Sequence, residues 1–191
     1  MPTRILVISG SLRRGSFARQ LARAAADLAV AGGAVATLAD LRDLEMPLYD
    51  GDLEDNHGLP SNAVALRRLV QQHDALLVVT PEYNASIPAV LKNALDWVSR
   101  PYAQEPGVSA FRGKTAALLA SSPGALGGLR ALVHLRQVLM NLGVLVLTEQ
   151  YALGGANSAF GASGELVDDK HRTAVGNVVS RLVTVAGKLA T

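Results

Sequence analysis

The stretch Ala75-Leu-Leu-Val-Val-Thr80 is the clearest strand signal in the chain, and Pro81-Glu-Tyr-Asn84 follows it directly. An apolar run of this length without polar alternation is typical of a strand that is buried on both faces. Pro81 lacks a backbone N–H and cannot continue a central strand, so the chain is expected to leave the sheet there. The stretch therefore predicts a central strand of a parallel sheet, with a polar loop at its carboxyl end.

Weaker apolar runs on both sides of this stretch alternate with helical patterns. They predict further strands at residues 4–9, 34–38, 114–120 and 144–147, and helices at 16–30, 61–72, 88–100, 128–142 and about 165–189. The acidic segment 40–60 contains Pro47, Gly51 and Gly58 and is predicted to be a long loop. Strands that alternate with helices predict an α/β fold, doubly wound, with a five-stranded parallel sheet and helices on both faces.

Composition narrows the class of protein. Of the 191 residues, 49% are hydrophobic and 18% are charged, so we expect one domain, 1–191, with a substantial core. The chain has no cysteine, which excludes disulfides and thiolate metal sites, and its four histidines show no metal-ligand spacing. Apolar runs are too short to cross a bilayer and no signal peptide is recognised, so we expect a cytoplasmic protein that does not associate with membranes. Cations and anions, 18 and 16 in number, are interspersed, and no nucleic-acid partner is expected.

The loop Gly10-Ser-Leu-Arg-Arg-Gly-Ser16 leaves the first predicted strand and enters a helix. Ligands of parallel sheets bind beyond the carboxyl ends of the strands, and the N–H groups at a helix start attract anions. Ser11 and Ser16 add hydroxyl groups, and Arg13 adds a charge-assisted donor. Helix capping by Ser16 is the structural alternative and is compatible with anion binding. The loop lacks the P-loop lysine and has Leu12 in place of a dinucleotide-site glycine, which favours a lone terminal phosphate such as that of FMN.

The loop after the central strand places a carboxylate, a phenol and a carboxamide together, on Glu82, Tyr83 and Asn84. Backbone-rich walls with such groups bind planar heteroaromatic rings, although an ordinary polar turn is an equally good interpretation of these residue types. Ser86 and Pro88 are expected to begin the next helix, with Ser86 as its cap.

These two loops, the stretch 81–101 and a third stretch, Ser121-Ser-Pro-Gly-Ala-Leu-Gly-Gly-Leu-Arg130, resemble the NAD(P)H-dependent FMN reductase family. The resemblance extends from residue 4 to about 150 and implies a flavodoxin-like sandwich that binds FMN noncovalently. It assigns the FMN phosphate to Ser11, Arg13 and Ser16, and the flavin ring to Pro81, Glu82, Tyr83, Asn84 and Ser121. The family usually has asparagine where this chain has Ala18, so one phosphate donor is missing. It often has glycine or tyrosine where this chain has Ala85.

The resemblance also implies an activity. Hydride would pass from NAD(P)H to bound FMN and then to a quinone, free flavin, azo compound or metal oxyanion such as chromate. The cofactor performs this chemistry, so no catalytic acid or base is assigned to the protein. One alternative is a flavodoxin-type electron carrier without NAD(P)H activity, although such carriers are usually strongly acidic and this chain is mildly basic. Another is a regulatory protein that kept the fold and lost the flavin.

A homodimer or homotetramer is expected, as in the family. Val90 and Trp97 fall outside the predicted core face of helix 88–100, and helix 128–142 leaves Val133, Val138 and Met140 outside its core stripe. Small monomers seldom expose this much apolar surface. For Trp97, a place at the edge of the core is the alternative to a subunit contact.

Overall fold

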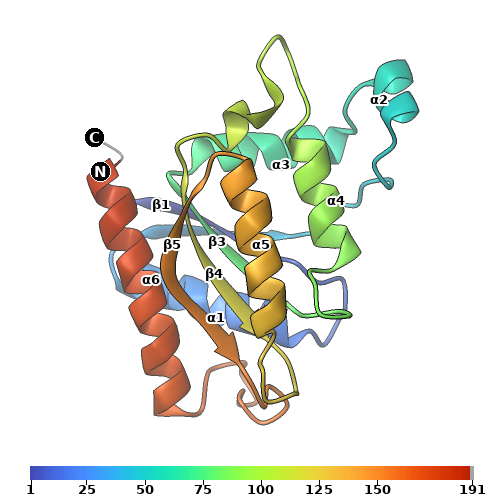
Figure 1. Cartoon of the computed structure of the whole chain (residues 1–191). Coiled ribbons are helices and arrows are strands. Elements are labelled where there is room, and N and C mark those ends of the chain that lie inside the picture. Colours follow the sequence, from blue (N-terminus) through green and yellow to red (C-terminus); the bar gives the residue numbers. More distant parts are fainter. Residues whose placement is uncertain (190–191) are drawn as a thin grey trace.

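A computed structural model describes residues 1–189, so the last two residues of the predicted domain 1–191 lie outside the described residues. Its five parallel strands form one sheet in the order β2-β1-β3-β4-β5 (Figure 1). They are β1 (Arg4–Ser9), β2 (Val35–Asp40), β3 (Ala75–Thr80), β4 (Thr115–Ser121) and β5 (Leu145–Leu153). The predicted α/β fold with a five-stranded parallel sheet is confirmed.

Helices cover both faces of the sheet (Figure 1). On one face lie α1 (Phe17–Ala31) and α6 (Asp169–Leu189), and on the other lie α3 (Ser61–Gln72), α4 (Ala89–Val98) and α5 (Leu129–Asn141). Side chains of β1 alternate between the two layers, because Ile5 and Val7 pack on the α1 side whereas Leu6 and Ile8 pack on the α4 side. Every residue of β3 is buried, as expected for the central strand.

Two predicted boundaries were wrong by more than two residues. The strand predicted at 144–147 continues to Leu153, and its pairing with β4 is shifted between Ala116 and Leu118. The sequence pattern did not indicate this second half because it contains the polar residues Thr148, Glu149 and Gln150. An edge strand tolerates polar, half-exposed residues that a central strand does not. The last helix begins at Asp169 rather than near 165. At this start, the Asp168 carboxylate accepts a hydrogen bond from the Lys170 N–H at 2.7 Å.

The predicted loop 40–60 contains a short helix, α2 (Gly51–His57), and a prediction of loop throughout was therefore wrong. Asp50 caps it by accepting a hydrogen bond from the Asp52 N–H at 2.9 Å, and Gly58, with φ of 71°, ends it. None of its residues is buried, so it has no apolar periodicity from which it could be recognised. Figure 1 shows α2 standing away from the sheet.

Trp97 is fully buried, which corrects its assignment to an outer face of the third predicted helix. The segment before α2 crosses over α4, and the Pro47 carbonyl accepts hydrogen bonds from Trp97 Nε1 and Asn93 Nδ2, each at 2.8 Å. The Tyr49 ring meets the indole edge to face, with centroids 5.0 Å apart. Trp97 is therefore unavailable for a subunit contact, and the alternative place at the edge of the core is the observed one.

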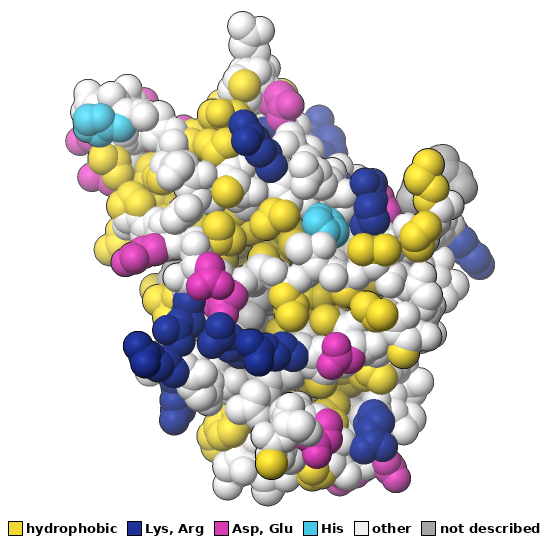
Figure 2. Space-filling model, turned by 180° about the vertical axis from the view of Figure 1, so that it is seen from behind, with side chains coloured by type: hydrophobic (Ala, Val, Ile, Leu, Met, Phe, Trp, Pro, Cys, Tyr) yellow, Lys and Arg dark blue, Asp and Glu magenta, His cyan; other side chains and the backbone are white. Residues whose placement is uncertain are grey.

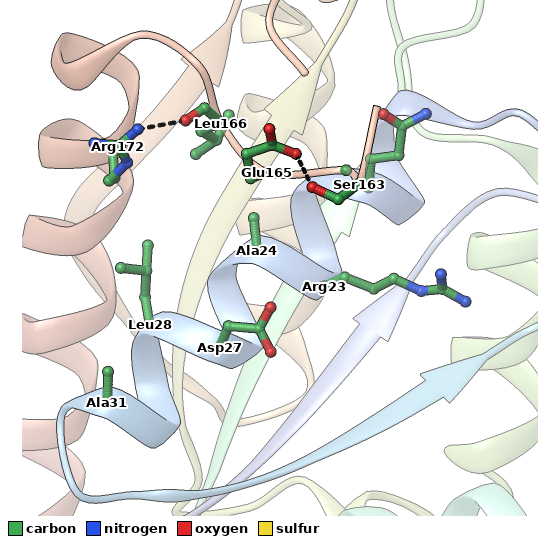
Figure 3. Close-up of a pocket in the computed structure, with 11 residues that line it drawn as sticks. Arg23, Ala24, Asp27, Leu28, Ala31, Ser163, Glu165, Leu166 and Arg172 are labelled. Carbon is green, nitrogen blue, oxygen red and sulfur yellow. Dashed lines mark hydrogen bonds between the residues drawn. The ribbon is translucent and has the colours of Figure 1, made fainter. Parts of the chain in front are cut away.

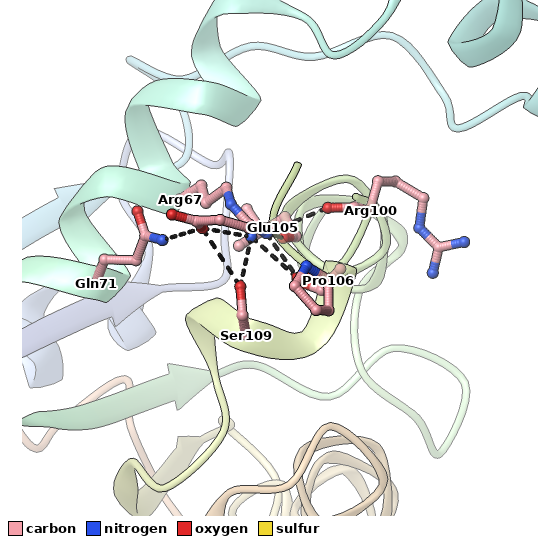
Figure 4. Close-up of polar contacts among 8 residues, drawn as sticks. Arg67, Gln71, Arg100, Glu105, Pro106 and Ser109 are labelled. Atoms are coloured by element: carbon pink, nitrogen blue, oxygen red, sulfur yellow. Dashed lines mark hydrogen bonds and ion pairs between the residues drawn. The ribbon is translucent and has the colours of Figure 1, made fainter. Parts of the chain in front are cut away.

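Arg67 of α3 is the largest buried polar side chain and ties the segment after α4 to the body (Figure 4). Its Nη1 donates to the carbonyls of Val98 and Gly107, both at 2.9 Å. Its Nη2 donates to Ser109 Oγ at 2.8 Å and to Glu105 Oε2 at 3.1 Å. A buried guanidinium with this many acceptors organises irregular backbone that has no ladder of its own.

We predict that Arg67→Ala lowers the free energy of unfolding by about 3 kcal/mol, because it removes a buried cation and leaves several carbonyls without a donor. Urea unfolding monitored by circular dichroism measures this. Arg68→Ala is the matched control: Arg68 neighbours Arg67 on the same helix but is exposed, so its loss should cost no more than about 0.5 kcal/mol. Equal losses for the two variants would contradict the role given to Arg67.

Candidate functional site

The carboxyl ends of β1, β3 and β4 meet at one edge of the sheet and enclose a hollow of about 80 Å³. All of the predicted site residues except Asn84 line it, together with four others that were not predicted. The predicted residues are Ser11, Arg13, Ser16, Pro81, Glu82, Tyr83 and Ser121, and the additional ones are Phe17, Ala18, Ser122 and Pro123. Three loops that are far apart in the sequence thus form one concave site.

The loop after β1 is shaped around the start of α1. Ser16 caps this helix, since its Oγ accepts a hydrogen bond from the Arg19 N–H at 3.3 Å. The buried Ser11 Oγ accepts from the Arg13 N–H at 3.3 Å. The Arg13 side chain is exposed and forms no ion pair with any described residue, whereas Arg19 is paired with Asp40. The loop therefore presents hydroxyl groups, a helix start and one uncommitted guanidinium to the hollow.

The loop after β3 forms a tight hairpin beyond the hollow. Tyr83 and Ser86 exchange two backbone hydrogen bonds of 3.0 Å, and the intervening Asn84 and Ala85 have φ of 50° and 63°. Two consecutive left-handed residues are the geometry of a type I′ turn. Asn84 lies at the exposed tip, which explains why it does not line the hollow. The prediction that Ser86 caps the next helix was wrong. The Ser86 Oγ hydrogen-bonds His134 Nδ1 at 2.8 Å, and α4 has no side-chain cap.

Glu82 points away from the turn and toward the start of α5. Its carboxylate accepts hydrogen bonds from the backbone N–H groups of Arg130 and Ala131, at 3.1 and 3.3 Å, and from Arg130 Nε at 2.7 Å. Burial would raise the pKa of the Glu82 carboxyl, but the Arg130 side chain and the two N–H groups outweigh it and hold the pKa below its ordinary value. Glu82 is therefore charged at neutral pH and fully engaged within the protein.

The loop after β4 closes the hollow from the third side. Ser121 is 2% exposed, and its Oγ has no hydrogen-bond partner in the protein. The Gly127 and Gly128 turn that follows has positive φ at both residues, and a Cβ on Gly127 would lie 2.6 Å from the Ala152 backbone. Only glycine fits there, so the loop can lie directly against the end of β5. An unpartnered buried hydroxyl in a concave site indicates a missing polar ligand.

One other surface groove lacks these features. A groove of about 530 Å³ lies between α1 and the segment before α6, and Figure 3 shows Ala24, Leu28 and Ala31 on one side of it and Leu166 on the other. It contains none of the predicted site residues. On the face opposite that of Figure 1, Figure 2 shows Lys and Arg side chains gathered most densely in one band, with Asp and Glu beside it. No group of three or more His, Asp or Glu residues able to hold a metal ion was found within residues 1–189.

An open parallel sheet in the order 2-1-3-4-5, with an anion loop after β1 at the point where the strand order reverses, is the architecture of flavodoxin-like proteins that bind FMN. The chain belongs to the NADPH-dependent FMN reductase family, whose model matches residues 3–158. This membership makes it an oxidoreductase that works with FMN and NAD(P)H, which confirms the predicted class, cofactor and fold.

Several named proteins are similar to this chain over most of its length. A quinone reductase of Escherichia coli K12 is 38% identical over 86% of this chain and 85% of that protein. A 2-hydroxy-1,4-benzoquinone reductase of a Burkholderia species is 39% identical over 90% of both chains. The solved structure of FerB, a flavoenzyme NAD(P)H:(acceptor) oxidoreductase from Paracoccus denitrificans, matches with a TM-score of 0.83 and 29% identity over 97% of this chain and 98% of that one.

Sequence reasoning missed the partner of Glu82. Arg130 belongs to the third stretch of the family resemblance, but nothing in its local pattern indicates that it pairs with a residue 48 positions earlier. The one available signal was the absence of a capping side chain before α5, where Gly128 occupies the cap position.

Among residues 1–189, no helix has the length and apolar character that crossing a membrane requires.

Proposed function

We propose that the chain is an FMN-dependent NAD(P)H:quinone oxidoreductase. The observation that carries the proposal is the buried, unpartnered Ser121 hydroxyl in a hollow shared by the loops after β1, β3 and β4. The hollow fits FMN chemically: serine hydroxyls, a helix start and a free guanidinium suit a phosphate, and the backbone of residues 81–83 suits the edge of a planar ring. The names of the similar quinone reductases support the choice of acceptor.

Each part of the site has a role in this proposal. Ser11, Ser16 and Arg13 bind the phosphate, together with the first N–H groups of α1. The main chain of Pro81, Glu82 and Tyr83 and the Ser121 hydroxyl orient the ring, and backbone N–H groups stabilise negative charge that develops on it. When bound, FMN supplies the two-electron chemistry between NAD(P)H and the acceptor. The Glu82 carboxylate is occupied by α5 and serves neither as acid nor as base. Ala18 is buried in the same hollow and offers no donor, so we expect weaker FMN binding than an asparagine there would support.

The surroundings of the hollow favour a planar apolar acceptor. Tyr83, which lines the hollow, is half exposed, and so are Leu126 and Leu129 in and after the loop that follows β4. Apolar side chains of this kind stack on or pack against a quinone ring but offer little to an oxyanion such as chromate. A cytoplasmic location completes the proposal and rests on the sequence alone.

An acceptor panel tests the proposed function. Purified protein loaded with FMN should oxidise NADH or NADPH steadily with 1,4-benzoquinone, and more slowly with free flavin, an azo dye or chromate, measured as the loss of absorbance of the reduced nicotinamide. Flavin that stays bound while no acceptor supports turnover would favour an electron carrier. A protein that binds no FMN would favour a regulatory role.

We predict that Arg13→Ala raises the FMN dissociation constant about tenfold, because a charge-assisted hydrogen bond to the phosphate is lost. Flavin fluorescence titration of the apoprotein measures this. Arg14→Ala is the control, since Arg14 is also exposed on the same loop but does not line the hollow. If both variants bind FMN as the unchanged protein does, Arg13 is not a phosphate ligand.

We further propose that the protein is a homo-oligomer, a dimer or tetramer, assembled through α5. Val133 and Met140 are 59% and 58% exposed on this helix, and Leu129 continues the same apolar strip toward the hollow. Val138 is half-buried and contributes less than expected, and Trp97 contributes nothing. An apolar strip beside the active site is the kind of surface that a second copy covers.

Val133→Glu should shift the assembly toward the monomer, because it would bury a charge against an apolar partner surface. Light scattering should give a mass two or four times 19.9 kDa for the unchanged protein and a lower mass for the variant. Val30→Glu on α1 is the matched control, since Val30 is 57% exposed on the opposite side of the sheet. A monomeric mass for the unchanged, flavin-loaded protein would refute the assembly.

A further inference from the structure

The start of α5 has an unusual cap. Its cap residue, Gly128, has φ of 94° and no side chain, so the first N–H groups of the helix need acceptors from elsewhere. Glu82 supplies one from a loop 48 positions earlier, through the N–H groups of Arg130 and Ala131. A carboxylate is also favourable at this position because the start of a helix carries partial positive charge.

In the contact between Glu82 and Arg130, only the Glu82 carboxylate is shielded from solvent. The Glu82 side chain is 8% exposed, whereas the Arg130 side chain is 58% exposed and folds over the carboxylate as an ion pair. Arg130 Nε and Nη2 reach the same oxygen, Oε1, and leave Oε2 to the backbone donors. Both carboxylate oxygens are thus satisfied, and the negative charge is neutralised within the protein.

This clamp joins two of the three loops that form the hollow. Glu82 lies between Pro81 and Tyr83, both of which line the hollow, and Arg130 and Ala131 follow directly on the loop that carries Ser121 and Pro123. β3 ends at Thr80, and the Tyr83–Ser86 bridge closes the loop on itself without pairing it to the sheet. The Thr80 Oγ1 donates to the Pro81 carbonyl at 2.8 Å, and the Glu82 side chain is the contact that ties this backbone to the loop after β4.

We propose that Glu82 is a positioning residue, whose carboxylate is clamped by Arg130 and the start of α5 and sets the position of the Pro81–Tyr83 backbone relative to Ser121. This inference rests on the proposed function, in which those groups orient the flavin ring. In the proposed function only the main chain of Glu82 contacts the flavin, whereas this inference assigns a role to the Glu82 side chain.

The chain contains a chemically matched control at the amino end of the central strand. Asp74 immediately precedes β3, and its carboxylate accepts hydrogen bonds from the Arg4 N–H and Arg4 Nη2, both at 2.8 Å. Like Glu82, it accepts from both the backbone and the guanidinium of one arginine, and its pKa is lowered as well: the hydrogen bond from the Arg4 side chain has the largest effect, partial burial opposes it, and the Arg4 N–H adds to it. Asp74 lies far from the hollow along the strand, so Asp74→Asn removes a similar interaction without affecting the site.

The test compares Glu82→Gln, Arg130→Ala and Asp74→Asn in the full chain. FMN affinity is measured by fluorescence titration, the environment of the bound flavin by visible circular dichroism, and stability by urea unfolding of the apoprotein. We expect Glu82→Gln to raise the FMN dissociation constant about tenfold and to change the flavin dichroism, since a neutral amide cannot accept from all these donors. Arg130→Ala should raise it about threefold, because the backbone donors remain. Asp74→Asn should lower stability and leave both flavin measurements unchanged.

A purely structural role makes a different prediction. Glu82→Gln would then lower stability as Asp74→Asn does, while the dissociation constant and the flavin dichroism stayed as in the unchanged protein, and this result would overturn the proposal. Amide hydrogen exchange gives a readout without flavin: the N–H groups of Arg130 and Ala131 should exchange faster in Glu82→Gln, and unchanged rates would also overturn it. An unchanged protein that binds no FMN would instead refute the proposed function.

Discussion

The whole molecule depends on one constraint: five parallel strands bring their carboxyl ends to the same edge of a sheet that must be covered on both faces. Each strand must return through a helix, so every loop at that edge connects the end of a strand to a helix or to the next crossover segment. The strand order reverses at β1 and β3, where the following helices go to opposite faces, and this divergence leaves room for a ligand. The hollow is thus a consequence of the connectivity, and the loop residues only equip it.

Contacts within the protein hold the loops around the hollow in place. These contacts leave the loop backbones accessible to a ligand. A type I′ turn closes the loop after β3, the Gly127 backbone lies against the end of β5, and Ser16 caps α1. Glu82 then links the second and third loops through α5. Much of the site consists of main-chain groups and short hydroxyl side chains, which are stiff donors and acceptors. Such a site suits a cofactor that carries its own chemistry and needs orientation rather than a catalytic side chain.

Particular elements illustrate how far sequence patterns could lead. The bounds of β3 and α3 were predicted to the residue, because a fully buried strand leaves a continuous apolar run and an amphipathic helix leaves a strong periodic signal. The helix α2 and the second half of β5 were missed, because neither has a regular apolar pattern: α2 buries no residue, and β5 lies at an edge. Trp97 was misplaced for another reason. Helical periodicity puts it off the core face of α4, and only the crossing of the Pro47 segment buries it.

The sequence by itself determined the fold class, the family and the three loops that surround the hollow, because these depend on patterns that are local in the chain: apolar periods, loops at strand ends and motif order. The tertiary structure alone decided which of those residues face the hollow and which are engaged elsewhere. Glu82 and Tyr83 are adjacent in the chain and both line the hollow, yet the Glu82 carboxylate is turned to the start of α5 and is 8% exposed, whereas Tyr83 is 51% exposed. Asn84 is one residue further on and lies at the exposed tip of a turn. Side-chain direction and partner choice depend on contacts between segments dozens of residues apart, and a linear pattern does not record such contacts.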